Sequence, residues 1–255
     1  MRLLPRRLGH GEEATLVEHL GELRARLLVA LGSVVIVAAV AFAFNGTLID
    51  WLIEPLPDDK ELITLGVTEP FFTSLKVSFF AGLAVALPVV LYQLWAFLAP
   101  AIAEHAQRVV AFMAAVGGIL FAAGIVFAYF VVLPRALQFL TNFNDDLFQV
   151  QIRASYYFSF VLVALLGMGL VFEMPIFVLT LVRLRILTAA QLRRNWRMGV
   201  VVVFVVAIAL PTVDPVSLAF EVVPLLALYF LSVWLAGYME KRWDIADERS
   251  PWAVE

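Results

Sequence analysis

Residues 156–184 read YYFSFVLVALLGMGLVFEMPIFVLTLVRL, and this stretch decides the fold. Glu173 is its only side chain that carries a charge at neutral pH before Arg183. A helix of this length would measure about 44 Å, whereas the hydrocarbon core of a bilayer is roughly 30 Å thick. We therefore expect a membrane-spanning helix that is tilted or bent.

Glu173 is the unusual residue of this stretch. It lies ten residues from Arg183, which places it about 15 Å from the end of the helix and near the bilayer midplane. Pro175 lacks a backbone N–H and is expected to kink the helix beside the carboxyl group. An ionisable group at that depth is energetically costly and indicates a functional site. The alternative is a structural glutamate that is protonated or hydrogen-bonded.

The composition indicates an integral membrane protein. The chain has 255 residues, of which 63% are hydrophobic and 15% are charged, whereas a soluble domain carries about 25% charged residues. The absence of cysteine excludes disulfides, thiolate metal sites and a cysteine nucleophile. Its three histidines lack metal-motif spacing, and no phosphate loop or nucleic-acid signature occurs. We expect no catalysis, cofactor, metal site or nucleic-acid partner.

Six spans are predicted within a single all-α membrane domain, residues 1–236. They cover about 27–44, 70–98, 109–133, 155–184, 197–211 and 216–236. The fifth is shorter than the usual 17–25 residues, so the bilayer is expected to thin there or flanking residues to snorkel. An amphipathic segment precedes the first span, because Leu16, Leu20, Leu23 and Leu27 share one helix face. Residues 237–255 form a charged tail.

The distribution of lysine and arginine predicts that both termini are cytoplasmic. With this orientation, 14 of the 18 basic residues lie in cytoplasmic segments. The other four, on the outer side, are Lys60, Lys76, Arg135 and Arg153. We therefore expect a multi-pass protein of a bacterial or archaeal cytoplasmic membrane.

Carboxylates on the cytoplasmic face are candidate ligands for arginine. Glu22 and Arg26 have the i,i+4 spacing of an internal ion pair, which is one interpretation of this segment. The other is that Glu22 receives a guanidinium from a partner, since carboxylate and guanidinium form two-pronged charged pairs. Glu104 lies on the same predicted face. Asp214, between two prolines, is expected to cap the sixth helix.

Six motifs occur in a fixed order along residues 15–235. They are HLxELRxRL from His19, EPFFTxxK from Glu69, YQxWAFxAP from Tyr92, FAYFVVxP from Phe127, FExP from Phe172, and the turn at Asp214. In this order they resemble the TatC family, the receptor subunit of the twin-arginine protein translocase. The resemblance implies six tilted helices in a concave, glove-like arrangement.

The resemblance also implies a function. Members of this family bind the paired arginines of signal peptides on folded cargo, in oligomeric complexes. With the single-span partners TatA and TatB they export that cargo, driven by the proton-motive force. Matching of motifs assigns signal-peptide binding to Glu22, Arg24, Phe97 and Pro100, with Glu104 as a further candidate. It maps the buried glutamate of the family to Glu173, which is then an intramembrane polar site for partners. It also maps a loop proline of the family to Pro55. Pro55 and Asp214 are both expected in loops on the outer side of the membrane.

Three positions depart from the family pattern. Ala106 stands where the family commonly has a glutamate, Leu218 where a glutamine is frequent, and Phe230 where a glutamate is usual. The main alternative function is a proton-coupled secondary transporter that uses Glu173 as its proton site. A membrane enzyme is a further alternative, but no paired aspartates, Ser/His pair or zinc motif is visible within the spans.

Overall fold

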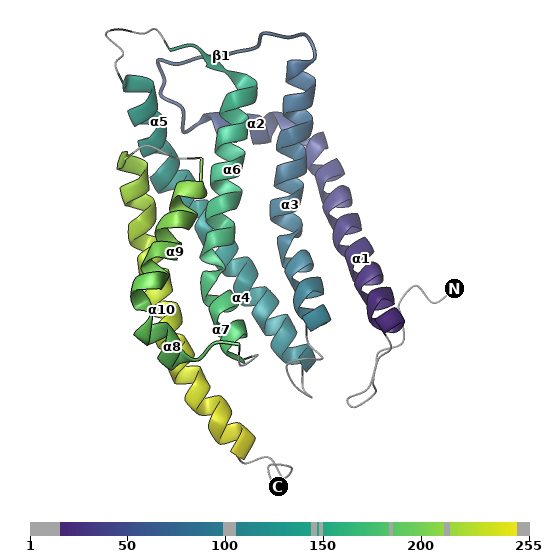
Figure 1. Ribbon diagram of the computed structural model, residues 1–255. Coiled ribbons are helices and arrows are strands. Elements are labelled where there is room, and N and C mark those ends of the chain that lie inside the picture. The colour runs from purple at the N-terminus through teal and green to yellow at the C-terminus, as the bar shows by residue number, and fades with distance from the viewer. Residues whose placement is uncertain are drawn as a thin grey trace. The chain divides into compact units, whose positions relative to one another are not determined.

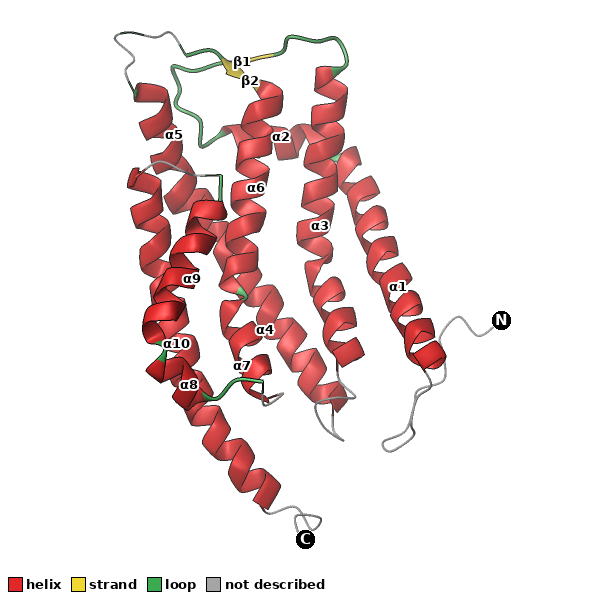
Figure 2. Ribbon diagram, viewed as in Figure 1, coloured by secondary structure: helices red, strands yellow, loops and turns green. Residues whose placement is uncertain are grey.

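The computed structural model describes residues 16–98, 106–143, 147, 150–183, 186–211 and 215–248. Nearly all of these residues are helical (Figures 1 and 2). The chain divides into two compact units. Unit 1 comprises Met1–Ile119 with Gln151–Leu162, and unit 2 comprises Leu120–Val150 with Val163–Glu255. The expectation of a single membrane domain stays a prediction.

Unit 1 is built on the antiparallel packing of two long helices. Helix α1 (Leu16–Ala43) runs beside α3 (Glu69–Leu98), and a short helix α2 (Asn45–Ile53) follows α1 (Figure 1). Gly82 permits this contact, because a Cβ atom there would lie only 2.5 Å from the Cα of Ala38. Small residues at such crossings let two backbones approach closely in a membrane. The predicted amphipathic segment and first span therefore belong to one continuous helix.

Two loops of unit 1 meet in a parallel pair of short strands (Figure 2). Strand β1 (Leu62–Ile63) pairs with β2 (Ile152–Arg153), so that Leu62 lies opposite Ile152. Strand β2 leads directly into α6 (Ala154–Phe172). The Tyr157 hydroxyl of α6 donates a hydrogen bond of 2.7 Å to the carbonyl of Leu52 in α2. These contacts fix the start of α6 against the first loop.

Unit 2 is organised around the long helix α10 (Pro215–Glu248). It packs against α7 (Met174–Arg183), α8 (Ala189–Arg194) and α9 (Trp196–Ala209). Its apolar core contains Val203 and Ala207 of α9 with Val222, Leu225, Tyr229 and Val233 of α10. The core therefore lies between the last two helices, as expected for a helical hairpin joined by a short turn.

A π-helical turn carries the third span past a proline. Helix α4 (Ala106–Phe127) continues through η2 (Ala128–Val132) into α5 (Leu133–Asn142). Pro134 follows that turn, where the wider backbone spacing accommodates a residue without an N–H. Pro134 therefore does not end the helix, which runs on to Asn142.

The helices match the number of predicted spans. Five helical segments are long and apolar enough to cross a membrane: His19–Ala43, Glu69–Phe97, Ala111–Asn142, Ala154–Arg183 and Pro215–Arg242. The remaining span, which is the fifth along the chain, corresponds to α9, a shorter apolar helix of 14 residues that is about 21 Å long. The shortness expected of the fifth span is therefore present in the structure.

Substitution of Gly82 tests the close contact in unit 1. We expect Gly82→Ala to lower the thermal unfolding midpoint in detergent, because the added methyl group meets backbone atoms of α1 that cannot move aside. Overpacking of this kind costs about 1–3 kcal/mol. Gly32→Ala is the matched control, since a Cβ at Gly32 meets nothing within 4 Å. Equal midpoints for the two variants would contradict the close packing.

Candidate functional site

The first candidate site lies where the beginning of α1 meets the end of α3. Arg26 donates to Glu22 Oε1 through Nε at 2.8 Å and through Nη2 at 2.5 Å. Its Nη1 also donates to Oε1 of Gln93 on α3, at 3.4 Å. The predicted internal ion pair of Glu22 is therefore present. Both bonds reach the same oxygen, and Oε2 accepts none from the described residues.

An aromatic contact joins the same two helices one turn away. The His19 ring stacks on Phe97, with ring centroids 4.5 Å apart and planes inclined by 21°. His19 precedes Glu22 by three residues, and Phe97 follows Gln93 by four, so these side chains lie on adjacent turns. We call Glu22, Arg26, Gln93, His19 and Phe97 the recognition cluster. It brings together two predicted site residues, Glu22 and Phe97, and adds Gln93 and His19.

The remaining predicted residues of this face are not part of the cluster. Arg24 is exposed on α1. Pro100 and Glu104 lie outside the described residues, and their roles stay predictions. Asp214 also lies outside them, just before α10 begins. Pro55 lies half-buried in the turn after α2.

Glu173 interrupts the long central helix of the chain. It stands alone between α6 and α7, so the predicted bend is a one-residue break. The backbone stays paired through the break, because Glu173 N donates to Leu170 O at 3.1 Å. Its own carbonyl accepts from the N–H groups of Ile176 and Phe177. Pro175 explains the break, since its ring cannot fit the ladder bond of a regular helix.

The Glu173 side chain is buried and unsatisfied. It is 1% exposed, and neither carboxylate oxygen has a hydrogen-bond partner among the described residues. Its neighbours Val171 and Met174 pack against the core of unit 2 between α9 and α10. A buried polar group without a partner costs free energy. Among the described residues, the Glu173 carboxyl group therefore has hydrogen-bonding capacity that is not used.

A second buried acid borders the same core. Glu221 is 1% exposed and directly precedes Val222, a member of the apolar core of unit 2. Reasoning from the sequence missed it, although an acidic residue six positions inside the predicted sixth span was a usable signal. Glu221 also lies three residues after Leu218, on the same face of α10. Unit 2 therefore holds two buried carboxyl groups beside one apolar core.

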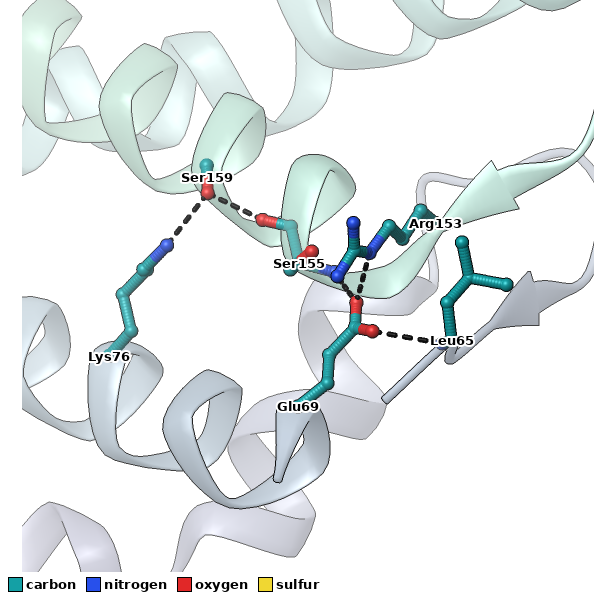
Figure 3. A network of polar contacts seen from close by, with 6 residues as sticks. All are labelled: Leu65, Glu69, Lys76, Arg153, Ser155 and Ser159. Carbon is teal, nitrogen blue, oxygen red and sulfur yellow. Dashed lines mark hydrogen bonds and ion pairs between the residues drawn. The ribbon is translucent and has the colours of Figure 1, made fainter. Parts of the chain in front are cut away.

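A third group of polar residues lies at the end of unit 1 where α3 and α6 begin (Figure 3). The side chain of Glu69, at the start of α3, is only 5% exposed. Its Oε1 accepts hydrogen bonds from Arg153 Nε at 2.9 Å and from the Ser155 backbone N–H at 3.2 Å. Its Oε2 accepts one from the Leu65 N–H at 2.9 Å. We call this arrangement the Glu69 clamp, because one carboxylate binds α3, β2 and α6.

The cation of the clamp is held from two sides. The Glu69 carboxylate raises the pKa of the Arg153 guanidinium above its usual value. The guanidinium carbon also lies 5.4 Å from the centroid of the Tyr156 ring, within the range of a cation–π contact. Arg153 therefore stays charged and fixed in place.

Lys76 extends the polar contacts into the membrane region of unit 1 (Figure 3). Its Nζ donates to the Ser159 hydroxyl at 2.9 Å, and that hydroxyl donates to the Ser155 carbonyl at 2.5 Å. Ser155 thus takes part in both groups of contacts. Its carbonyl accepts the hydrogen bond from Ser159, which in turn accepts one from Lys76, and its backbone N–H donates to Glu69. Lys76 links α3 to α6 two turns below the clamp.

A family model described as Sec-independent protein translocase protein (TatC) matches residues 18–224, most of the chain. The chain belongs to the TatC family. As a TatC protein it is a component of the Sec-independent protein translocase and not an enzyme. The resemblance inferred from the sequence motifs is confirmed.

Curated relatives match this chain along nearly their full length. The TatC protein of Carboxydothermus hydrogenoformans is 36% identical over 237 residues, which cover 92% of this chain and 97% of that protein. TatCd of Bacillus subtilis is 35% identical over 231 residues, covering 91% and 95%. The crystal structure of the twin-arginine translocase receptor TatC in DDM matches with a TM-score of 0.75 and 36% identity. It covers 86% of this chain and 99% of that one, which confirms the predicted all-α TatC fold.

Double substitution tests the Glu69 clamp of this TatC protein. We expect Glu69→Gln and Arg153→Gln each to lower the thermal unfolding midpoint in detergent, because each leaves the other charge without its partner. The double variant should lose less than the sum of the two, since the remaining groups are then neutral. Strictly additive losses would show that the two side chains do not interact. Glu61→Gln, an exposed carboxylate of the preceding loop, serves as the control.

Proposed function

We propose that this TatC protein is the receptor that binds twin-arginine signal peptides of folded cargo. Family membership supports the general role, and the recognition cluster carries the specific one. Glu22 is the acid of that cluster, and its side chain is 17% exposed. Its Oε2 accepts no hydrogen bond from the described residues. A guanidinium of the signal peptide can approach that oxygen, because carboxylate and arginine match in geometry as well as charge.

Arg26 prepares this carboxylate for its ligand. By donating two hydrogen bonds to Oε1, it fixes the orientation of the Glu22 carboxylate. Gln93 in turn holds Arg26 from α3, and the His19–Phe97 stack closes the neighbouring turn. Phe97 thus has a positioning role beside the acid. Arg24, Pro100 and Glu104 complete the proposed binding face, with Glu104 as the acid nearest in sequence to Ala106.

The transport step rests on further proposals. The protein is proposed to work in an oligomeric complex with single-span TatA- and TatB-like partners, and the proton-motive force drives export. It lies in the cytoplasmic membrane of a bacterium or archaeon with both termini cytoplasmic. The distribution of basic residues supports this orientation, since 14 of 18 then lie on the cytoplasmic side. The signal peptide consequently meets the recognition cluster before it crosses the membrane.

Glu173 is proposed to act in assembly with a partner helix. Its two oxygens, which have no hydrogen-bond partner among the described residues, can accept hydrogen bonds from a polar side chain that a single-span partner brings into the membrane. Such bonds between helices contribute about 1 kcal/mol in membranes. Pro55 and Asp214 are assigned to the outer loops of the same protein, as the family pattern implies.

Peptide binding tests the recognition cluster. We expect a peptide with paired arginines to bind the purified protein more tightly than the same peptide with paired lysines, because lysine cannot form the two-pronged pair. Glu22→Gln should weaken binding of the arginine peptide about tenfold. Glu61→Gln should leave it unchanged. Equal affinity for both peptides, unaltered by Glu22→Ala combined with Glu104→Ala, would disprove the site.

Substitution of Glu173 separates recognition from assembly. We expect Glu173→Gln to retain binding of the twin-arginine peptide and to reduce transport of a folded reporter in membrane vesicles. The amide keeps the size of the side chain but accepts fewer hydrogen bonds. Glu61→Gln again provides the control. Loss of peptide binding in Glu173→Gln would instead assign this glutamate to recognition.

A further inference from the structure

One face of α10 changes from apolar to aromatic to basic along its length. Phe230 and Leu231 are exposed, Trp234 is 66% exposed, and Tyr238 is exposed one turn later. Lys241 and Arg242 are exposed on the following turn. These positions recur every three or four residues, so they form one continuous stripe on the helix.

The aromatic and basic parts of this stripe are in direct contact. The rings of Trp234 and Tyr238 stack with centroids 6.2 Å apart and planes inclined by only 8°. The guanidinium carbon of Arg242 lies 4.7 Å from the centroid of the Tyr238 ring. A cation–π contact holds the guanidinium by its face and leaves its N–H groups at the edge free to donate.

Helix α8 adds a further cation to the stripe. A Cβ atom on Gly237 would lie 3.3 Å from Nη1 of Arg193. The guanidinium therefore packs directly against the backbone of α10 at Gly237, which has no side chain. The last residues of α10 extend beyond α8 (Figure 1). We call Trp234, Tyr238, Arg193, Lys241 and Arg242 the α10 interface patch. All five belong to unit 2.

The cations of this patch are not held in ion pairs by the acidic side chains that the structure describes. No described acidic side chain forms an ion pair with Arg193, Lys241 or Arg242. The nearby acid Glu240 is already engaged, because its Oε2 accepts a hydrogen bond of 3.1 Å from the Ala189 N–H at the start of α8. Three cations and two aromatic rings therefore face outward together.

We propose that the α10 interface patch binds the phosphate headgroup of an anionic phospholipid. Arginine and lysine donate to the phosphate, while tryptophan and tyrosine lie at the depth of the headgroups, where their amphipathic rings are favoured. The acyl chains lie along the exposed apolar surface of Phe230 and Leu231. The basic, aromatic and apolar parts of the stripe thus follow the same order as the phosphate, the interfacial region and the acyl chains of one lipid molecule.

The apolar part of the stripe favours a lipid over an acidic protein. An acidic segment would satisfy the cations but would leave Phe230, Leu231 and Trp234 without a matching surface. A phospholipid provides charge and hydrocarbon together, and these residues belong to a helix long enough to cross the bilayer. The proposal requires only that α10 spans the membrane, so it does not depend on signal-peptide recognition.

Lipid binding to the full-length chain in a neutral detergent tests the proposal. The protein is titrated with phosphatidylglycerol or with phosphatidylcholine of the same acyl chains, and bound lipid is measured by native mass spectrometry. We expect wild-type protein to retain phosphatidylglycerol preferentially. The double variant Arg193→Gln/Arg242→Gln should lose about fivefold in affinity for each cation removed. The variant Lys60→Gln/Arg135→Gln, which changes the net charge equally outside the patch, should bind as wild type does.

Measurements on the wild-type protein keep the test decisive if the variants do not fold. Retention of phosphatidylglycerol should fall as the salt concentration rises, because exposed charges are screened. Excess inorganic phosphate should not displace the lipid, since it lacks the acyl chains. Equal retention of the two lipids, an equal loss in the control variant, salt-independent retention, or displacement by phosphate or by an acidic peptide would each overturn the proposal.

Discussion

A bilayer offers no hydrogen-bond partner to a peptide group, and the described structure follows from that constraint. The spans are helices, and the irregular backbone is brief. At Glu173 the helix breaks for one residue, yet neighbouring carbonyls and N–H groups still pair across the break. At Pro134 the chain avoids a break altogether by widening into a π turn. Both of these departures from regular helix lie two residues before a proline, where one ladder bond is impossible in any case.

Two buried carboxyl groups, those of Glu69 and Glu173, differ in how their hydrogen bonds are satisfied. Glu69 of unit 1 accepts three hydrogen bonds, and Lys76 of the same helix donates to a serine hydroxyl. These bonds join the start of α3 to β2 and to the start of α6. In unit 2 the Glu173 carboxylate has no partner among the described residues, at the junction of α6 and α7. One buried carboxyl group thus holds α3 and α6 together, whereas the other has no hydrogen-bond partner among the described residues.

Hydropathy, proline positions and charge distribution predicted the helical class, the number of spans and the short fifth span, because these properties are local. The bend at Glu173 was predictable for the same reason, since Pro175 lies beside it. The Glu69–Arg153 pair was not, because 84 residues separate its members and the two strands beside it are two residues each. The His19–Phe97 stack likewise depends on how α1 and α3 align. The predicted third span ends at about residue 133, just before Pro134, because the sequence does not reveal a π turn.

The separation of Glu69 from Arg153 also has a consequence for biosynthesis. A ribosome adds roughly 5–20 residues per second, so Glu69 is added to the chain about 4–17 s before Arg153. During that interval α1 and α3 can already pair, since their contact needs nothing later in the chain. The carboxylate, however, must remain hydrated until α6 arrives with the arginine and Ser155. The clamp therefore cannot close until residue 155 of the 255 has been added.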